Sequence, residues 1–380
     1  MDFRLSERDE LLRKTIGEWA DKEIPPYMEA MEETGEFPME LLPKMGQMGI
    51  LGVIVPPEYG GTDMGALSRI IVLEELGRVC PAIPMAIQVH HMCTYALNTW
   101  GNQDQKKKYL PPLTKGETMG VVAVTEPSGG SDVAGMQTTA RLDRDKYILN
   151  GRKCFITNSH TGNIWVIIAR TGEGGKGLSA FIVEKDFPGA KVGRKENKVG
   201  LRGANTGELA FDNCEVPKEN LLGAEGQGMT VAIQDIVDCG RPGMTSVALG
   251  ILNGVLRQAV KFANERSLYG KPINKLQAIQ WHIAEIFSDL EISRVLAYRV
   301  GWMLDNKVPC ASESALAKQY ACEAAARSAR KAIEIHGSYG IMKEYAVQRL
   351  LRDAVVTIPA GGTGEIAKLV LAREAMTRFG

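Results

Sequence analysis

The sequence predicts an α+β protein with an N-terminal helical domain, a middle β domain and a C-terminal helical bundle. Changes in the hydrophobic pattern along the 380 residues carry this prediction, because helical spacing gives way to strand-like runs and then returns. We expect the domains to span residues 1–117, 118–228 and 229–380. A chain of this length exceeds the usual size of a single hydrophobic core, so several packed units are expected.

The first region has the pattern of amphipathic helices. Apolar residues recur at helical spacing near the start of the chain, as at Leu11, Ile16 and Trp19. Ser6, followed three residues later by Asp9, is an acidic variant of a helix-capping pattern. We therefore expect a helix to begin just after Ser6.

The middle region changes to short β-branched runs that are separated by turn residues. The runs read VVAVT, KYILNGRKCFIT, NIWVIIAR, LSAFIVEK and GELAFDNCEV. This texture is typical of successive strands joined by tight connections. It predicts a small antiparallel sheet or barrel.

Helical spacing returns after residue 228, in longer segments. Ile279, Ile283, Ile286 and Leu290 stand four, three and four residues apart, which places them on one helix face. Long helices joined by short loops favour a four-helix bundle. Two helical parts around a β region do not form a Rossmann pattern, so a nicotinamide site is not indicated.

Composition limits the classes of partner. Lys plus Arg and Asp plus Glu both number 45, so the chain has no overall basic field for nucleic acid or an anionic membrane. The seven cysteines are scattered without a C-x-x-C pair or a Cys/His cluster, and no metal site is expected. The N-terminus lacks an apolar signal core, and no apolar run reaches the roughly 18 residues of a membrane span. We expect a cytoplasmic protein without a membrane span.

Two glycine-rich stretches stand out as candidate ligand sites. In VTEPSGGSDV, Thr125 and Ser131 offer hydroxyls, and Gly129 and Gly130 expose backbone N–H groups to ligand oxygens. In TIPAGGTGEIAK, Pro359 and three glycines interrupt a helical segment. Each stretch is either a plain turn or a place where backbone lies against a ligand.

Six separated motifs resemble the acyl-CoA dehydrogenase family, in its order and approximate spacing. They are TEPSGGSDVAG, KCFITN, GLRGANTGELAFDNCEVPKENLLG, ERSLYGKPINKLQAIQ, IHGSYGIMKEYAVQRLLRDA and GGTGEI. The resemblance runs from Phe3 to Arg378. It implies the three-domain fold given above, bound FAD and a homotetramer made of two dimers. It also implies an acyl-CoA thioester as substrate and an electron-transfer flavoprotein or similar electron acceptor.

The resemblance also implies which residues hold FAD. Family members bind it between the middle and C-terminal domains, and the neighbouring subunit reaches over the adenine half. The flavin half should contact Val124, Thr125, Ser131, Phe155 and Thr157, where Phe155 replaces a Trp of many relatives. The pyrophosphate and adenosine part of FAD should instead be contacted by residues of the neighbouring subunit, namely Arg266, Tyr269, Gln277, Gly337 and Ser338.

Thr363 and Glu365 complete the expected cofactor set, but two acidic residues depart from the family pattern. Glu365 follows GGTG, and Glu334 stands where relatives often have Gln. An acidic residue beside a pyrophosphate is electrostatically costly, so the contacts of both are left open.

The substrate site implied by the resemblance lacks its usual base. Its expected members are Gln88, Ser131, Asp238, Arg241, Gly361 and Gly362. Most relatives have a Glu base at the position of Gly361, and a minority have it at the position of Gly240, just before Arg241. The dehydrogenation requires a proton acceptor as well as a hydride acceptor, and both known places for the proton acceptor are glycines here.

One hypothesis is that the base has moved to the helix that lines the acyl pocket. Gln88-Val-His-His-Met92 lies on this helix, and a neutral imidazole is a competent base near neutral pH. His90 and His91 are adjacent and point about 100° apart, so only one of them should face the substrate; we favour His91. Relatives that act on cyclic esters such as cyclohex-1-ene-1-carboxyl-CoA are similar in using a base here for a 1,4-elimination, but their base is acidic. The alternative for both His residues is an ordinary packing role.

Two further hypotheses change the class of protein. Flavin monooxygenases share this fold and lack the Glu, and a non-catalytic protein could retain FAD or CoA for structural reasons. The retained TEPSGGSD motif and Arg241 favour CoA ligands over a monooxygenase. Loss of flavin colour on mixing with an acyl-CoA would separate an enzyme from a binding protein.

Overall fold

The computed structural model describes residues 4–380 and begins with the predicted helical region. Its helices are α1 (Glu7–Glu23), α2 (Met28–Thr34), α3 (Leu41–Gln47), α4 (Ala66–Val79), α5 (Ala82–Trp100) and α6 (Gln103–Lys115). The predicted helix start is confirmed, because the Ser6 side chain accepts a hydrogen bond from the Asp9 backbone N–H at 3.1 Å. Helices α4 and α5 are the most buried of the six, and they carry the polar residues discussed below.

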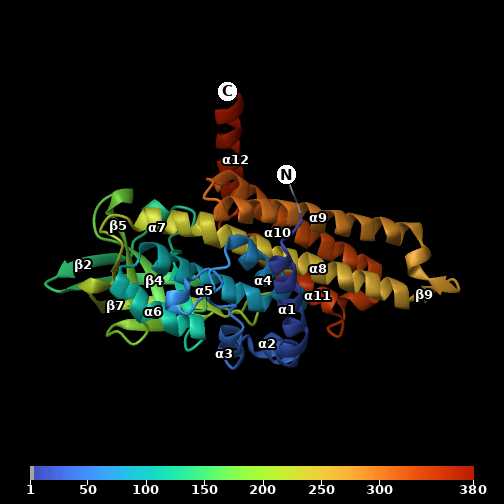
Figure 1. The fold of residues 1–380 in the computed structure, drawn as a ribbon, viewed down its shortest axis with the longest axis horizontal. Coiled ribbons are helices and arrows are strands. Elements are labelled where there is room, and N and C mark those ends of the chain that lie inside the picture. Colours follow the sequence, from blue (N-terminus) through green and yellow to red (C-terminus); the bar gives the residue numbers. More distant parts are fainter. Residues whose placement is uncertain (1–3) are drawn as a thin grey trace.

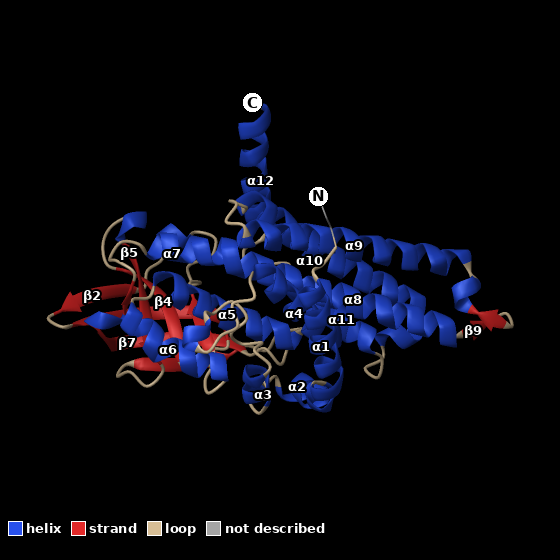
Figure 2. Cartoon of the chain, viewed as in Figure 1, coloured by secondary structure: helices blue, strands red, loops and turns tan. Residues whose placement is uncertain are grey.

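The middle region forms one eight-stranded sheet at one end of the molecule (Figure 2). Its strands are β1 (Gly120–Ala123), β2 (Thr139–Asp143), β3 (Lys146–Thr157), β4 (Ile164–Arg170), β5 (Leu178–Glu184), β6 (Ala190–Lys195), β7 (Thr206–Pro217) and β8 (Leu221–Leu222). They run in the order β6-β7-β3-β2-β4-β5-β8, and β1 lies beside β4. Most pairs are antiparallel as predicted, whereas β1 and β2 each pair with β4 in parallel. A G-x-G-x-x-G spacing at Gly172, Gly174 and Gly177 joins the antiparallel strands β4 and β5, so it does not open a nucleotide-binding helix.

The C-terminal region is the predicted bundle with a small hairpin. It contains α7 (Gly228–Asp235), a π-helical turn (Ile236–Gly240), α8 (Arg241–Glu265), β9 (Ser267–Leu268), β10 (Lys271–Pro272), α9 (Gln277–Asp305), α10 (Ala311–His336), α11 (Ala346–Thr357) and α12 (Gly364–Phe379). The face predicted for α9 is confirmed, since Ile286 and Leu290 are buried and Ile279 and Ile283 pack against the same core.

Close backbone contact ties the N-terminal helices to the bundle. A Cβ on Gly250 of α8 would lie 2.5 Å from the Cα of Gly77 on α4, so the two helices approach at a pair of glycines. Figure 1 shows α4 and α8 running side by side through the middle of the molecule. The sheet lies at one end, the β9 hairpin lies at the opposite end, and α12 projects away from the body. Among residues 4–380, no helix combines the length and apolar character that crossing a bilayer requires.

Candidate functional site

The TEPSGGSD stretch is a turn held in place by a buried ion pair. Glu126 accepts hydrogen bonds from the backbone N–H groups of Gln137 (2.6 Å) and Thr138 (3.0 Å), and from the Lys153 ammonium (2.7 Å). Burial opposes ionisation of Glu126, but Lys153 and the other donors lower the pKa of its carboxyl below the ordinary value. Thr125 and Ser131 are therefore presented on a fixed turn next to β3, with Val124 just before it.

Phe155 is exposed in a backbone conformation that aromatic residues rarely adopt. Its φ is +57°, and it sits where the pairing of β3 and β7 shifts register, in a β-bulge. The ring is 65% exposed, while Thr157, two residues further on, is buried. A strained backbone that turns an aromatic ring outward is a feature of ligand sites, and it fits a ring-shaped cofactor lying on this face.

A second group of predicted cofactor residues lies at the β9 hairpin. The Arg266 guanidinium stands 5.5 Å from the centre of the Tyr339 ring, and Tyr269 is 90% exposed with φ +54°. Gly337 and Ser338 are exposed in the turn after α10, and Gln277 is exposed at the start of α9.

The two groups lie at opposite ends of the molecule (Figure 1). Helix α8 has 25 residues, so about 37 Å separates Arg241 from Arg266 at its two ends. Figure 1 shows the sheet and β9 at opposite ends of the molecule. One chain does not bring the two groups together.

The two acidic departures have separate environments. Glu365 lies exposed in the first turn of α12, where its own backbone N–H and the Thr363 hydroxyl lower the pKa of its carboxyl. Thr363 caps this helix by accepting from the Ile366 N–H at 3.4 Å. Glu334 forms ion pairs with Arg330 (3.2 Å) and His282 (3.6 Å, when the imidazole is protonated).

The glycine loop before α12 has a fixed backbone. The Lys318 ammonium, which is buried, donates to the carbonyls of Ile358 (2.5 Å) and Gly362 (2.8 Å). Gly361 and Gly362 have φ of +67° and +98°, a region that favours glycine.

Gly361 lies close to Gly240, the last residue of the π-helical turn. A Cβ on Gly361 would lie 3.9 Å from the Gly240 carbonyl oxygen and 2.8 Å from Cγ of Met244. A Cβ on Gly240 would meet the end of Met92 at 3.1 Å. The two Cβ positions thus have different neighbours, Met244 for Gly361 and Met92 for Gly240, although the Gly361 position lies near the Gly240 carbonyl.

Asp238 and Arg241 flank Gly240. Asp238 accepts a hydrogen bond from the Tyr95 hydroxyl at 2.7 Å, which fixes its carboxylate next to α5. Arg241 is mostly buried, and its only hydrogen bond to described residues is a long one to the Ala311 carbonyl, at 3.5 Å. Its desolvation lowers the pKa of the guanidinium.

His90 and His91 are completely buried on α5, and both have structural partners. His91 Nδ1 accepts from Arg69 Nε at 3.2 Å, so its Nε2–H donates to the Ile50 carbonyl at 2.9 Å. His90 Nδ1 accepts from the Gly120 N–H at 3.2 Å. Burial lowers the pKa of His90 to about 4, and burial together with Arg69 lowers the pKa of His91 well below its ordinary value.

This arrangement argues against the predicted role of the two histidines as the base. The lone pair that would accept a substrate proton already accepts an N–H bond in each ring. Taking up a proton would also create an imidazolium in a fully desolvated site.

Two buried charged residues near these groups, Arg69 and Asp235, were not predicted as site residues. Arg69 interrupts the apolar stretch ALSRIIVL, and Asp235 interrupts VAIQDIV. Both are almost fully buried. A charged residue inside an apolar helical run was the available signal.

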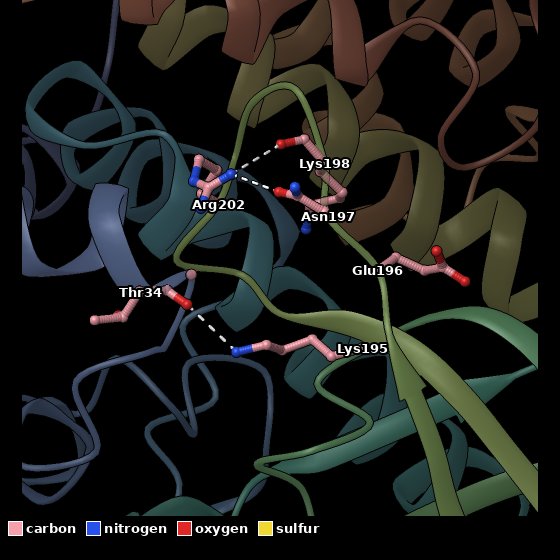
Figure 3. Close-up of a pocket in the computed structure, with 7 residues that line it drawn as sticks. Thr34, Lys195, Glu196, Asn197, Lys198 and Arg202 are labelled. Atoms are coloured by element: carbon pink, nitrogen blue, oxygen red, sulfur yellow. Dashed lines mark hydrogen bonds between the residues drawn. The ribbon is translucent and has the colours of Figure 1, made fainter.

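Two surface hollows lie away from these residues. One, of about 230 Å³, lies between Thr34 and the loop from Lys195 to Arg202 (Figure 3). Arg202 there already bonds Asn197 at 2.7 Å. The other, of about 620 Å³, lies over β2 and β3 and includes Arg141 and Thr171. Neither contains a predicted site residue.

Comparisons with known proteins agree with the order of the three regions. Family models match residues 6–117 (acyl-CoA dehydrogenase, N-terminal domain), 121–214 (middle domain) and 226–376 (C-terminal domain). An acyl-CoA dehydrogenase of Bacillus subtilis is 42% identical over 374 residues, 98% of each chain. The solved butyryl-CoA dehydrogenase of Megasphaera elsdenii superposes with a TM-score of 0.96 at 33% identity, covering 99% of this chain and 100% of that one. A chain in the structure described as the electron transferring flavoprotein of Acidaminococcus fermentans has a TM-score of 0.97 at 37% identity, with 99% and 100% coverage.

Proposed function

The chain belongs to the acyl-CoA dehydrogenase family of FAD-dependent oxidoreductases, and we propose that it dehydrogenates an acyl-CoA thioester without the loop glutamate of its relatives. The observation that carries the second part is that both positions where the family resemblance places a glutamate base are glycines, and that a Cβ on Gly361 would lie 3.9 Å from the Gly240 carbonyl oxygen.

The residues of the flavin half fit a planar cofactor. Phe155 offers an exposed ring beside the fixed turn of Thr125 and Ser131, and Gly362 has open space where a Cβ would stand. FAD, when bound there, supplies the hydride acceptor. The chain's own residues orient the cofactor on the β3 face, and Asp238 and Arg241 lie on the side of the glycine pair.

The cofactor site requires a second copy of the chain in this proposal. Arg266 and Tyr269 lie about 37 Å of helix away from the start of α8, so they would complete the site of a partner subunit. Trp281, Val295 and Trp302 are exposed on α9 at multiples of seven residues, which gives a further apolar face to bury. These features support the homotetramer of two dimers implied by the resemblance.

Relocation of the base remains part of the proposal. We expect the proton to leave a carbon that faces the pocket helix α5, as in a 1,4-elimination on a cyclic acyl group. His91 could serve only if Arg69 released its Nδ1. His91→Ala, with His90→Ala as its neighbour control, tests this role by the rate of flavin reduction. Unchanged rates in both variants would exclude a histidine base.

The proposed function is tested by anaerobic titration of the purified protein with straight-chain, branched and cyclic acyl-CoA esters. We expect a yellow oligomer whose flavin absorbance bleaches with at least one ester and is restored by an electron-transfer flavoprotein, the acceptor suggested by the family and by the relative from Acidaminococcus fermentans. Bleaching only by an external reductant, followed by oxygen uptake and substrate hydroxylation, would instead indicate a monooxygenase. A protein that binds CoA esters but never bleaches would be a binding protein.

A further inference from the structure

Arg69 is a buried cation without an ion pair among residues 4–380. The side chain lies on α4 and is 1% exposed. Its Nε donates to His91, and its Nη1 donates to the Cys239 carbonyl at 3.0 Å. Its Nη2 has no hydrogen-bond partner in the described part of the chain. A desolvated guanidinium with a free donor is energetically costly unless something else satisfies it.

Gln88 presents a second unpartnered atom to the same place. Its Nε2 makes one weak contact, to Met244 Sδ at 3.7 Å, and its Oε1 has no hydrogen-bond partner among the residues that the structure describes. A Cβ on Gly243 would lie 2.7 Å from Arg69 Nη2 and 2.7 Å from Gln88 Oε1. Arg69 Nη2 and Gln88 Oε1 therefore both lie next to Gly243, which has no side chain to fill the position between them.

Asp235 makes no direct bond to Arg69. Its two carboxylate oxygens are buried, and within the described residues 4–380 they accept no hydrogen bond and form no ion pair with Arg69. Burial raises the pKa of Asp235 well above its ordinary value, which favours the neutral acid. Arg69 therefore keeps a donor, Nη2, that no group among residues 4–380 accepts from.

This polar cluster, Arg69 with Gln88, borders the proposed reaction site through one side chain. Met244 contacts Gln88 at its sulfur, and its Cγ lies 2.8 Å from where a Gly361 Cβ would stand. Methionine is unbranched and adapts its shape readily, so an acyl chain that enters beside Gly361 could displace it and reach the cluster.

We propose that Arg69 and Gln88 bind a carboxylate at the far end of the substrate's acyl group, so that the preferred substrates are CoA esters of dicarboxylic acids. The proposal rests on the acyl-CoA function proposed above and specifies its substrate class. A carboxylate would accept from Arg69 Nη2 in a charge-assisted bond. It would also accept from the Gln88 amide after that group turns its NH₂ toward it, since the two amide orientations are nearly equivalent in shape.

The test compares glutaryl-CoA with pentanoyl-CoA, whose acyl chains have equal length, and with the terminal amide of glutaryl-CoA. Calorimetric binding and flavin bleaching are measured with the FAD-loaded protein. We expect the carboxylate ester to be favoured by roughly 100-fold or more, because a site built to bond a polar group strongly rejects an analogue that lacks it. Arg69→Met, which removes the charge and keeps the bulk, should abolish or invert this preference, and Arg69→Lys should restore part of it.

The outcomes separate the two proposals. Bleaching by pentanoyl-CoA without any preference for glutaryl-CoA would overturn the carboxylate site and leave the acyl-CoA function standing. A preference for the amide would assign the cluster to a neutral polar acyl group and equally overturn it. Absence of binding and bleaching with all esters would refute the acyl-CoA function itself. Because wild-type selectivity alone decides these cases, a variant that fails to fold does not weaken the test.

Discussion

Replacing Gly240 by glutamate would return a carboxylate to one of the two positions where the family resemblance places the base. Gly240 has φ −65° and ψ −54°, an ordinary helical conformation, and a new Cβ would meet only the flexible end of Met92 at 3.1 Å. At Gly361, φ is +67° and the new Cβ would lie 2.8 Å from Met244 Cγ. A left-handed conformation costs a non-glycine residue about 1–2 kcal/mol, whereas replacing a helical glycine gains up to about 1 kcal/mol. Gly240→Glu should therefore be more stable than Gly361→Glu by about 1–3 kcal/mol.

The assay is anaerobic flavin reduction by a straight-chain acyl-CoA such as butyryl-CoA. A positioned general base contributes roughly 10²- to 10⁴-fold, so we expect Gly240→Glu to reduce its flavin at least about 100-fold faster than Gly240→Gln. The glutamine variant has the same bulk and lacks only the basic carboxylate. Equal rates in the two variants, with FAD retained in both, would show that Gly240 does not face the reacting carbon. The assignment of both glycines as vacated base positions would then be wrong.

Three further predictions concern cofactor retention and stability. Arg266→Ala should weaken FAD retention more than it slows flavin reduction, because a phosphate contact supplies binding; unchanged FAD affinity by equilibrium dialysis would contradict this. Lys153→Met should lower the free energy of unfolding in urea by about 3–5 kcal/mol, since it leaves the Glu126 carboxylate buried without its cation; the double variant with Glu126→Gln should recover most of the loss. Asp353 is fully buried, and its pKa is raised from 3.8 to about 6, so its stabilising contribution is complete below pH 3.8 and is lost as pH rises through about 6. Asp353→Asn should thus gain up to about 3 kcal/mol relative to wild type between pH 4 and pH 7, and parallel pH profiles would refute the shift.

The fold was predictable because its signals are local. The Ser6 cap, the apolar face of α9 and the alternation of strands and turns all depend on residues that are close in sequence. The TEPSGGSD turn was recognisable as well, yet the force that holds it was not. Glu126 and Lys153 are far apart in sequence, and the bulge that turns Phe155 outward depends on the pairing of β3 with β7.

The candidate substrate site was less predictable, because its character depends on which side chains meet across helices. The sequence placed His91 on the pocket helix, but its two ring nitrogens are occupied by groups from α4 and from the loop at Ile50. Gln88 was expected to contact substrate, whereas the buried Arg69 on α4 was not predicted as a site residue. The histidines were predicted as site residues because histidine is rare in this chain. A charged residue within an apolar helical run, as at Arg69, is a stronger sign of a functional site.

The backbone conformation at Gly361 disfavours a glutamate there, in addition to the missing carboxylate itself. Lys318 holds the loop through the Ile358 and Gly362 carbonyls, and the left-handed φ of Gly361 belongs to that held conformation. A glutamate introduced there must either adopt this strained conformation or break the contacts of a buried ammonium. Gly240 carries no such constraint, since its helical backbone accepts any residue except proline without strain. A single substitution that restores a carboxylate base should therefore be tolerated better at Gly240 than at Gly361.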